Sequence, residues 1–292
     1  MSPILSNCPL GIVPLNWKYD STQKAKFLDG IASYGFTGIQ ISGEQALSTE
    51  FLGLMKDRGI ASSEQYFAIR CDEDGPLEGS DAESTQTINQ AAGAAVQMLV
   101  IAVDGSADRD RCAGRADSGP QLSELGFKRL ADQVQSTALA AATMGIASSF
   151  HPHAATYIES EAETKKLFDL MDPNLVGMCL DVGHWIVGGG DPIAAVTRYE
   201  SRITHLHVKD VNPEVLDKLL SGEIKSMNSA VEDHKLFVPA GTGLLKLPEL
   251  FQALNVISYA GWLMSEQDSA WEPQEEASGI SMSNIKLALQ YE

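Results

Sequence analysis

Short apolar segments recur along this chain, and an amphipathic stretch follows most of them. The segments are rich in Val, Ile and Leu, a composition typical of parallel strands that are covered on both faces. We expect eight strands, at 11–15, 38–41, 61–66, 98–103, 147–150, 176–180, 203–208 and 261–264. A strand–helix unit that repeats eight times predicts an α/β fold of the (β/α)8 or TIM-barrel type.

The intervening helices carry recognisable end signals. Gly35, Gly59 and Gly145 stand where helices would end, because glycine readily adopts the left-handed conformation of a C-terminal cap. Asp191 followed by Pro192 is typical of an N-cap and a first helical residue. We expect helices at 21–34, 44–58, 123–144, 159–170, 192–199, 247–254 and 275–291. An open doubly wound sheet is the alternative, but the chain has neither GxGxxG nor GxxxxGK[ST].

The length of 292 residues fits one α/β barrel as well as two average domains. No shift in composition marks a boundary, so we expect a single domain over 1–292. The polar stretches 71–84 and 104–123 are predicted to be long loops after strands. A longer insertion at about 212–242 is predicted to carry a short helix at 213–220 and to fold over the C-terminal face of the barrel, where barrel active sites are built.

The charge balance limits the classes of partner. Lys and Arg number 21 against 39 Asp and Glu, a net charge of -18 that repels nucleic acid and anionic lipid. The N-terminus resembles no signal peptide, and no apolar run is long enough to span a bilayer. The four cysteines form no CxxC pair, which disfavours a disulfide scaffold and a zinc knuckle. We expect a cytoplasmic protein without nucleic-acid or membrane partners. The sequence leaves open whether the chain forms a homo-oligomer.

Four potential metal ligands stand at the carboxyl ends of four consecutive predicted strands. His151 follows the fifth strand, Asp181 follows the sixth, His207 lies near the end of the seventh and Glu266 follows the eighth. In a closed barrel those ends converge on one face, so the four side chains could surround one ion. Two imidazoles and two carboxylates suit Mn²⁺, Co²⁺, Zn²⁺ or Fe²⁺ better than Ca²⁺, which prefers oxygen alone. Each residue alone has an ordinary structural explanation, and only their common register predicts a metal site.

Two residues beside these ligands are candidates for proton transfer. Lys209 lies two positions beyond His207 and therefore points the same way on a strand, and His184 lies three positions beyond Asp181. A desolvated lysine can titrate near neutral pH, where an imidazole already titrates. No GxSxG elbow indicates a serine nucleophile.

Further polar or aromatic residues flank the strand ends and could contact a polyol. Each of them also has a structural explanation. Glu44 could equally begin the following helix, where a carboxylate complements the helix dipole. We interpret His205, two residues before the metal-ligand candidate His207, as structural. The substrate-contact candidates are Asn16, Trp17, Glu44, Glu64, His153, Trp185, Gln267 and Asp268.

Several segments of the chain form recognisable motifs: PLNW at 14–17, FHPH at 150–153, LDVGH at 180–184, GGDP at 189–192, HLHVKD at 205–210, FVP at 237–239, GW at 261–262 and EQD at 266–268. These motifs resemble those of the xylose-isomerase-like TIM barrels and, within them, the inosose (2-keto-myo-inositol) dehydratases. DxGH and HxKD are shared by the wider group, whereas FHPH, EQD and the inserted loop narrow the likeness to the dehydratases. The resemblance implies a cyclic polyol ketone as substrate and a divalent metal, Mn²⁺ or Co²⁺ with Zn²⁺ or Mg²⁺ as alternatives. It implies that His151, Asp181, His207 and Glu266 hold that metal.

Departures from the wider group favour one reaction over another. The sugar isomerases and ketose epimerases of the group usually carry Glu where this chain has His151, and often a second Glu where it has Tyr157. The epimerases also carry Arg where this chain has Pro213. The paired carboxylates of epimerisation are therefore missing. Residues 232–235 and Ala240 differ from the dehydratase pattern, which leaves the exact substrate open.

Together these observations predict a metal-dependent lyase that forms an enolate from a substrate such as 2-keto-myo-inositol and then eliminates water. Which of Lys209 and His184 is base and which is acid stays open. A metal-dependent ketose isomerase or epimerase is the main alternative. A DNA-repair nuclease on the same barrel is disfavoured by the net charge, and a sugar-binding protein without catalysis is disfavoured by the intact ligand set.

Overall fold

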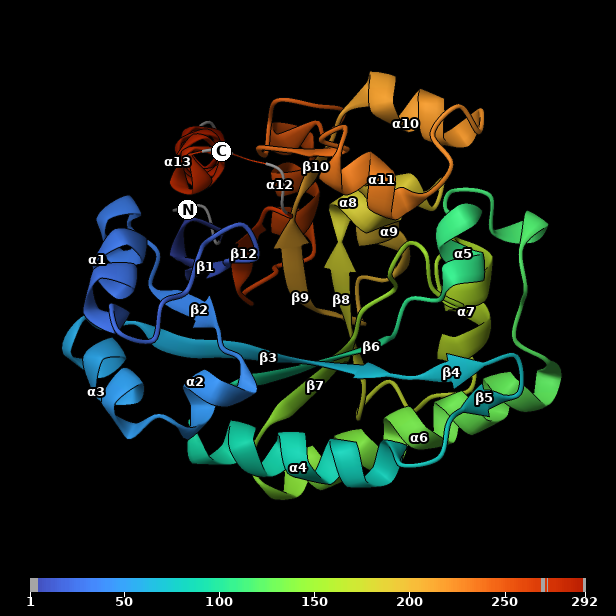
Figure 1. Ribbon diagram of the computed structural model, residues 1–292, viewed down its shortest axis with the longest axis horizontal. Coiled ribbons are helices and arrows are strands. Elements are labelled where there is room, and N and C mark those ends of the chain that lie inside the picture. The colour runs from blue at the N-terminus through green and yellow to red at the C-terminus, as the bar shows by residue number, and fades with distance from the viewer. Residues whose placement is uncertain (1–4, 269–270, 272, 291–292) are drawn as a thin grey trace.

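Eight parallel strands close into a barrel in the computed structural model, which describes residues 5–268, 271 and 273–290. Around the barrel the order is β1-β12-β9-β8-β7-β6-β3-β2, and helices surround the strands (Figure 1). The strands are β1 Leu10–Val13, β2 Gly38–Gln40, β3 Ala61–Ile69, β6 Met98–Val103, β7 Ala147–Phe150, β8 Gly177–Asp181, β9 Ile203–Val208 and β12 Leu263–Glu266. Each overlaps a predicted strand, so the TIM-barrel prediction is confirmed.

The seven predicted outer helices are all present. They occur as α1 Lys24–Tyr34, α2 Gly43–Leu47 with α3 Thr49–Asp57, α6 Glu124–Thr143, α7 Glu161–Phe168, α9 Pro192–Arg198, α12 Leu247–Val256 and α13 Gln274–Ala288. The predicted helix 44–58 is two helices because the backbone of Ser48 is extended, at φ -92 and ψ 101. The Ser48 hydroxyl also accepts the Phe51 N–H and caps α3. Among the described residues, no helix has the length and apolar character needed to cross a membrane.

The predicted loop 71–84 is partly wrong. Its first half is a hairpin of β4 (Cys71–Asp72) and β5 (Gly75–Pro76), and α4 (Ser80–Gly93) begins within its second half. Apolar periodicity is weak in α4, which buries Ser80, Ser84, Ile88 and Ala91 against the barrel, so the hydropathy pattern does not reveal it. The predicted loop 104–123 contains a short helix, α5 (Ala107–Arg111), and a 3₁₀ turn, η2 (Ala116–Ser118).

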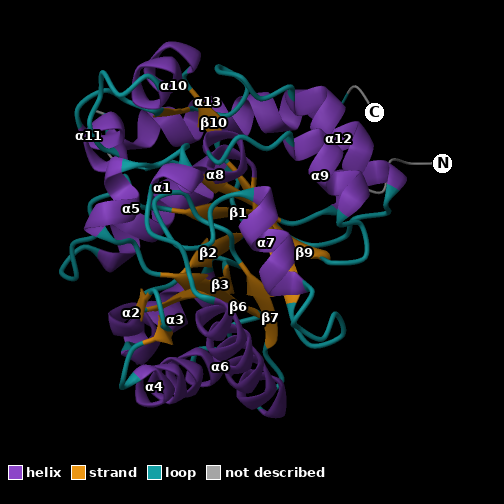
Figure 2. Cartoon of the chain, turned by 90° about the vertical axis from the view of Figure 1, so that its right-hand side faces the viewer, coloured by secondary structure: helices purple, strands orange, loops and turns teal. Residues whose placement is uncertain are grey.

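The insertion at 212–242 carries the predicted helix as α10 (Pro213–Leu220) and a second one, α11 (Met227–Glu232). Asn212 caps α10 through its side-chain oxygen. The ends of the insertion meet where β10 (Asp210–Val211) pairs antiparallel with β11 (Phe237–Val238). In both views α10 and α11 lie on the side of the molecule away from α4 and α6 (Figure 1, Figure 2).

The insertion has its own apolar cluster, which includes Leu219, Met227 and Phe237 together with Ala113 and Ala154 from loops after β6 and β7. This shared core holds the insertion against those two loops. A single carboxylate fixes its return to the barrel, because the Asp210 side chain accepts N–H bonds from Val211, Gly241, Gly243 and Leu245.

Candidate metal centre

The four predicted ligands meet at one end of the barrel interior. His151 comes directly after β7, Asp181 ends β8, His207 lies in β9 and Glu266 ends β12. At most 6% of any of these four residues is exposed. One donor atom of each lies within 4.8 Å of the others. Strand register brings them together, since Asp181 pairs with His207 and the neighbouring pair of strands aligns His207 with Met264.

Donor atoms in this group lack the partners that burial normally requires. His151 Nδ1, Asp181 Oδ2, His207 Nδ1 and Glu266 Oε2 are buried without a hydrogen bond to any residue that the structure describes. Glu266 Oε2 lies 2.7 Å from His207 Nδ1, yet the two do not have hydrogen-bond geometry. A buried polar atom without a partner costs about 1–3 kcal/mol, so such atoms are rare in folded proteins. Three of these atoms lie around one point, because His207 Nδ1 is 3.7 Å from Asp181 Oδ2 and 2.7 Å from Glu266 Oε2. His151 presents its Nε2 to the same point, 3.7 Å from Asp181 Oδ2. A divalent cation fits as the common partner of this group.

A second layer of groups orients the ligands. Asp181 Oδ1 accepts the His184 N–H at 2.8 Å, which caps α8 (Val182–Val187) and leaves Oδ2 for the centre. His207 Nε2 donates to Glu64 Oε2 at 3.0 Å, and His205 Nε2 donates to the same oxygen. A carboxylate on the outer nitrogen of a histidine fixes its tautomer and ring plane.

Glu64 is fully buried. Burial raises the pKa of this carboxyl, but the His207 and His205 imidazoles outweigh burial, and the net pKa is lowered. Glu64 therefore lies beneath the candidate metal centre as a charged support, although we predicted it as a substrate contact. His205 is buried beside it, in agreement with its structural interpretation.

Lys209 is buried among carboxylates. Its Nζ donates to Glu266 Oε1 at 2.9 Å, pairs with Asp268 Oδ2 at 2.9 Å and donates to His184 Nε2 at 3.1 Å. Burial lowers the pKa of Lys209, but Asp181, Asp268 and Glu266 outweigh it and the net pKa is raised. The expectation of a lysine that titrates near neutral pH is thus wrong for these surroundings. Lys209 is an ammonium ion whose charge the carboxylates neutralise.

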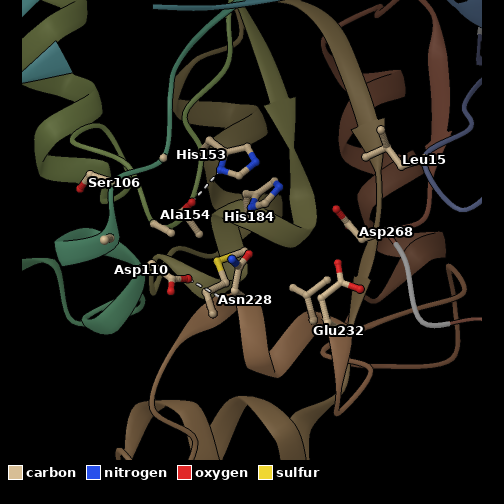
Figure 3. Close-up of a pocket in the computed structure, with 14 residues that line it drawn as sticks. Leu15, Ser106, Asp110, His153, Ala154, His184, Asn228, Glu232 and Asp268 are labelled. Atoms are coloured by element: carbon tan, nitrogen blue, oxygen red, sulfur yellow. Dashed lines mark hydrogen bonds between the residues drawn. The ribbon is translucent and has the colours of Figure 1, made fainter. Parts of the chain in front are cut away.

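Two imidazoles face the space above the centre. The rings of His153 and His184 stack with centroids 3.6 Å apart (Figure 3). Burial lowers the pKa of both, that of His153 to about 3. Both are therefore neutral, and the Lys209 ammonium makes Nε2 of His184 a hydrogen-bond acceptor.

A cavity of about 610 Å³ opens beside these imidazoles. His153, His184 and Asp268 line one side of it, while α5 and α11 line another. The two helices are joined by a hydrogen bond of 2.8 Å from the Asn228 N–H to Asp110 Oδ1 (Figure 3). The volume is within the range of small-molecule sites, and polar groups converge on it from several loops.

Two buried carboxylates hold the loops that border the cavity. Glu163 pairs with the buried Arg109 of α5 at 3.0 and 3.2 Å. Glu159 accepts the N–H of Gly114 at 2.7 Å and that of Ala155 at 2.6 Å. Ala155 lines the cavity with a φ of +66, a strained value for alanine. Burial raises the pKa of Glu159 to about 7.

Comparison with known proteins places the chain in a family. The family model described as the xylose isomerase-like TIM barrel matches residues 28–286. The chain belongs to this family. An inosose dehydratase of Bacillus anthracis is 26% identical over 276 residues, which cover 89% of this chain and 90% of that protein. Inosose dehydratase 2 of Bacillus cereus is 34% identical over 153 residues, which cover 52% of this chain and 51% of that protein.

Solved structures share the fold at low identity. The probable 3-DHS dehydratase AsbF of Bacillus anthracis superposes with a TM-score of 0.71 at 13% identity, over 95% of this chain and 98% of its own. A D-allulose 3-epimerase from Methylomonas sp., in complex with D-allulose, gives a TM-score of 0.72 at 15% identity, over 97% of each chain. These two likenesses show a common barrel fold.

The remaining predicted substrate contacts divide into two groups within this barrel. His153 and Asp268 line the cavity. Gln267 is buried next to Asp268 and donates to the Phe237 carbonyl at 3.0 Å, so it ties β12 to the insertion. Asn16 is buried just beyond β1.

The other three candidates lie away from the cavity. Trp17 packs edge-on against Phe27 and Tyr34, and its indole N–H donates to Ser278. The ring of Trp185 packs edge-on against Tyr199. Glu44 is exposed in the first turn of α2. This position agrees with our alternative interpretation that Glu44 begins a helix. Two of the three are large aromatic side chains, which bury most apolar area in the helix layer.

Sequence reasoning did not single out several residues that border the centre. Asp110 of α5 and Asn228 of α11 reach the cavity from short helices far apart in the sequence, and no motif marks them. Cys179 is different, because it lies two residues before Asp181 on β8 and so faces the same interior. The alternation of side chains along a strand could therefore have identified Cys179 from the sequence.

Proposed function

We propose that the protein is a metal-dependent dehydratase that acts on a cyclic polyol ketone such as 2-keto-myo-inositol. The observation that carries the proposal is the convergence of His151, Asp181, His207 and Glu266, whose donor atoms lie buried within 4.8 Å of one another, beside Lys209 and His184. The inosose dehydratases that cover most of this chain support the same reaction class.

The ligand set suits Mn²⁺ or Co²⁺, with Zn²⁺ and Mg²⁺ as alternatives, because it mixes imidazole and carboxylate donors. A bound divalent cation would act as a Lewis acid on the ketone oxygen and acidify the neighbouring C–H bond. The four ligand residues would also fix the orientation of the ketone relative to the cavity.

His184 and Lys209 are placed to move the two protons of the elimination. In our proposal the neutral imidazole of His184 accepts the α-carbon proton, and the C–H electron pair becomes the new double bond. Lys209 Nζ protonates the β-hydroxyl, which leaves as water with the C–O electron pair. The Nε2–Nζ contact of 3.1 Å then lets the proton on His184 return to Lys209. One water is lost, and both residues regain their starting states.

The cavity walls hold the rest of the ring. His153 and Asp268 offer polar groups to its hydroxyls, and α5 and α11, joined by Asp110 and Asn228, form another wall. Water excluded from the centre strengthens each charge interaction within it.

A metal-dependent ketose isomerase or epimerase is the alternative. It shares proton removal but returns the proton instead of expelling water. His151 stands where those enzymes carry Glu, and Tyr157 stands in the place of the second Glu, so the chain lacks the carboxylates that favour this alternative.

The test combines metal analysis of the purified protein with an assay of 2-keto-myo-inositol in the presence of Mn²⁺ or Co²⁺. We expect a product that has lost water and absorbs in the ultraviolet as a dione or enol. A stereoisomer of unchanged mass would instead support the epimerase, and no product with any metal would refute both reactions. Glu44→Gln serves as the control, because Glu44 is exposed in α2.

We also propose that residues 1–292 form one domain and that the protein works in the cytoplasm without nucleic-acid or membrane partners. The net charge of -18 supports this setting. A homo-oligomer is compatible with it, and light scattering of the purified protein would measure the mass of the particle.

A further inference from the structure

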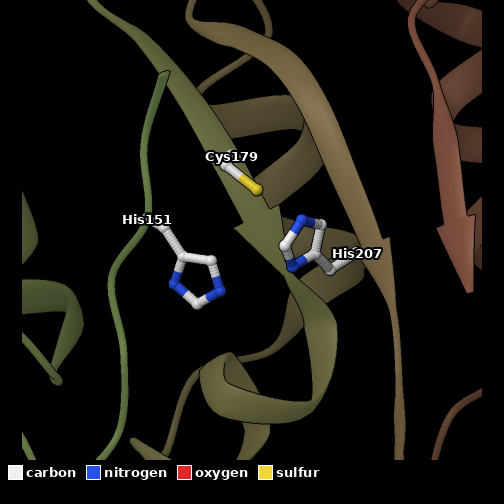
Figure 4. A group of neighbouring side chains, drawn as sticks. All are labelled: His151, Cys179 and His207. Carbon is white, nitrogen blue, oxygen red and sulfur yellow. The ribbon is translucent and has the colours of Figure 1, made fainter. Parts of the chain in front are cut away.

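A second set of donor atoms lies in the barrel interior, next to the centre described above. Cys179 of β8 is fully buried. Its Sγ and one nitrogen each of His151 and His207 lie within 4.8 Å of one another. Figure 4 shows these side chains directed from β8, the end of β7 and β9 into one space.

Hydrogen bonding separates this group from another nearby cluster. Glu64, His205 and His207 also lie within 4.8 Å of one another, but hydrogen bonds among them already account for their proximity. In the cysteine group, a fully buried thiol lies within 4.8 Å of one nitrogen each of His151 and His207. His207 also has a buried nitrogen, Nδ1, without a hydrogen-bond partner among the described residues. A thiol with two imidazoles at this spacing therefore points to a ligand.

The donor chemistry indicates which ligand. Asp181 and Glu266 offer oxygen, which suits harder cations, whereas a thiolate with two imidazoles selects softer cations such as Cd²⁺. A bound cation deprotonates a coordinating thiol. We propose that Cys179, His151 and His207 form an alternative site for a soft, thiolate-preferring divalent cation, which excludes the cation held by Asp181 and Glu266.

The two ligand sets exclude each other because they share two histidines. Both sets use His151 and His207, so one ion must leave before the other binds. The cysteine lies deeper, since Met98, Val100 and the partly buried Tyr66 pack against it in the barrel interior. A cation there sits farther from the cavity that would receive substrate. On the proposed function, which this last step assumes, soft cations inhibit by occupying the wrong position.

Cadmium binding tests the site without any assay of turnover. Chelator-stripped protein is titrated with Cd²⁺ while the thiolate-to-cadmium charge-transfer absorption is followed. We expect one equivalent to produce the band in the wild type. Cys179→Ser should abolish it and weaken Cd²⁺ binding by more than the roughly 10–100-fold that loss of an outer-shell partner costs. Cys71→Ser, at the half-buried cysteine outside the barrel interior, should leave the band unchanged.

A competition experiment tests whether Cd²⁺ and Mn²⁺ exclude each other from the protein. Mn²⁺ bound to the stripped protein, followed by electron paramagnetic resonance, should be released one for one by Cd²⁺ in the wild type. Cys179→Ser should still bind Mn²⁺ and release it only at much higher Cd²⁺. A band that persists in Cys179→Ser, or simultaneous binding of Mn²⁺ and Cd²⁺ by the wild type, would overturn the proposal.

Asp181→Asn keeps the test decisive if Cys179→Ser does not fold. Asparagine can still cap α8, so the variant removes a hard ligand and leaves the cysteine set intact. We expect Mn²⁺ binding to be lost while the cadmium band remains. If the folded variant loses both, the two sets are not separate. These readouts stand even if 2-keto-myo-inositol is not a substrate, so failure of the proposed function is distinguishable from failure of this site.

Discussion

The two halves of the barrel contribute differently to the centre. We call β7, β8, β9 and β12 the ligand arc, and β1, β2, β3 and β6 the support arc; each is a run of neighbouring strands. The ligand arc supplies the four candidate ligands and Lys209. The support arc reaches the group through Glu64 of β3, which hydrogen bonds His205 and His207 on β9.

Strand order explains this contact. In the order of the closed barrel, β3 stands diametrically opposite β9, so Glu64 spans the interior. The ligand arc therefore positions chemistry through strand ends, whereas the support arc stabilises it from across the barrel. The following changes test that division, from the largest expected effect to the smallest.

Asp181→Ala removes one ligand of the ligand arc and the cap of α8. We expect the bound metal to be lost and turnover to fall by about 10³-fold or more, because Lewis-acid assistance is worth several kcal/mol. Elemental analysis and the dehydration assay measure the two effects. Full metal content with full turnover in this variant would show that the centre is misassigned.

Lys209→Met removes the cation between Glu266 and Asp268. We expect kcat to fall by about 10²–10⁴-fold, the range for loss of a proton-transfer group. The free energy of unfolding should fall by about 3–5 kcal/mol, because buried carboxylates are left unpaired. Lys218→Met on the exposed face of α10 is the matched control, and equal losses in both variants would contradict a role for Lys209.

Glu159→Gln tests the buried carboxyl group that holds the loops after β6 and β7. The folded-state pKa of Glu159 is raised from 4.5 to about 7. Its contribution to stability is therefore fully present below pH ~4.5 and is lost as pH rises through about 7, a change of about 3 kcal/mol. Denaturant unfolding at several pH values should show this slope in the wild type and not in the variant. An unchanged slope would place the pH dependence elsewhere.

Glu64→Gln keeps the shape of the support-arc contact and removes its charge. We expect metal affinity to fall about 10–100-fold, as for other outer-shell partners of a ligating histidine. At saturating metal, kcat should change little because Glu64 is fully buried below the centre. Titration with Mn²⁺ and assays at two metal concentrations separate these effects. A loss of kcat that excess metal does not restore would give Glu64 a direct part in the reaction.

Glu44→Gln changes an exposed carboxylate of the support side. We expect the free energy of unfolding to stay within about 0.5 kcal/mol and the KM for substrate to be unchanged. Thermal unfolding and steady-state kinetics measure both. A raised KM would restore Glu44 as a substrate contact and would blur the distinction between the arcs.

Local sequence determined the barrel and the position of the four ligands. Apolar runs and helix-end glycines depend on neighbouring residues, so they reveal strands and helices directly. A residue at the carboxyl end of a barrel strand has its location determined by the fold, which is why His151, Asp181, His207 and Glu266 could be expected to meet. The hydropathy pattern did not predict helix α4, because its buried face is made mostly of small and polar side chains.

Tertiary structure alone decided what those residues contact. Trp17 lies in the loop after β1 and Trp185 lies in α8, and the rings of both pack against aromatic residues of the helix layer. The ion pairs of Lys209 and the contact of Glu64 across the barrel join residues 57 and 141 positions apart. Only closure of the barrel creates such neighbours, and these neighbours set the charge state of Lys209. The physical reason is that backbone periodicity is a local property, whereas burial and charge depend on everything the closed fold brings together.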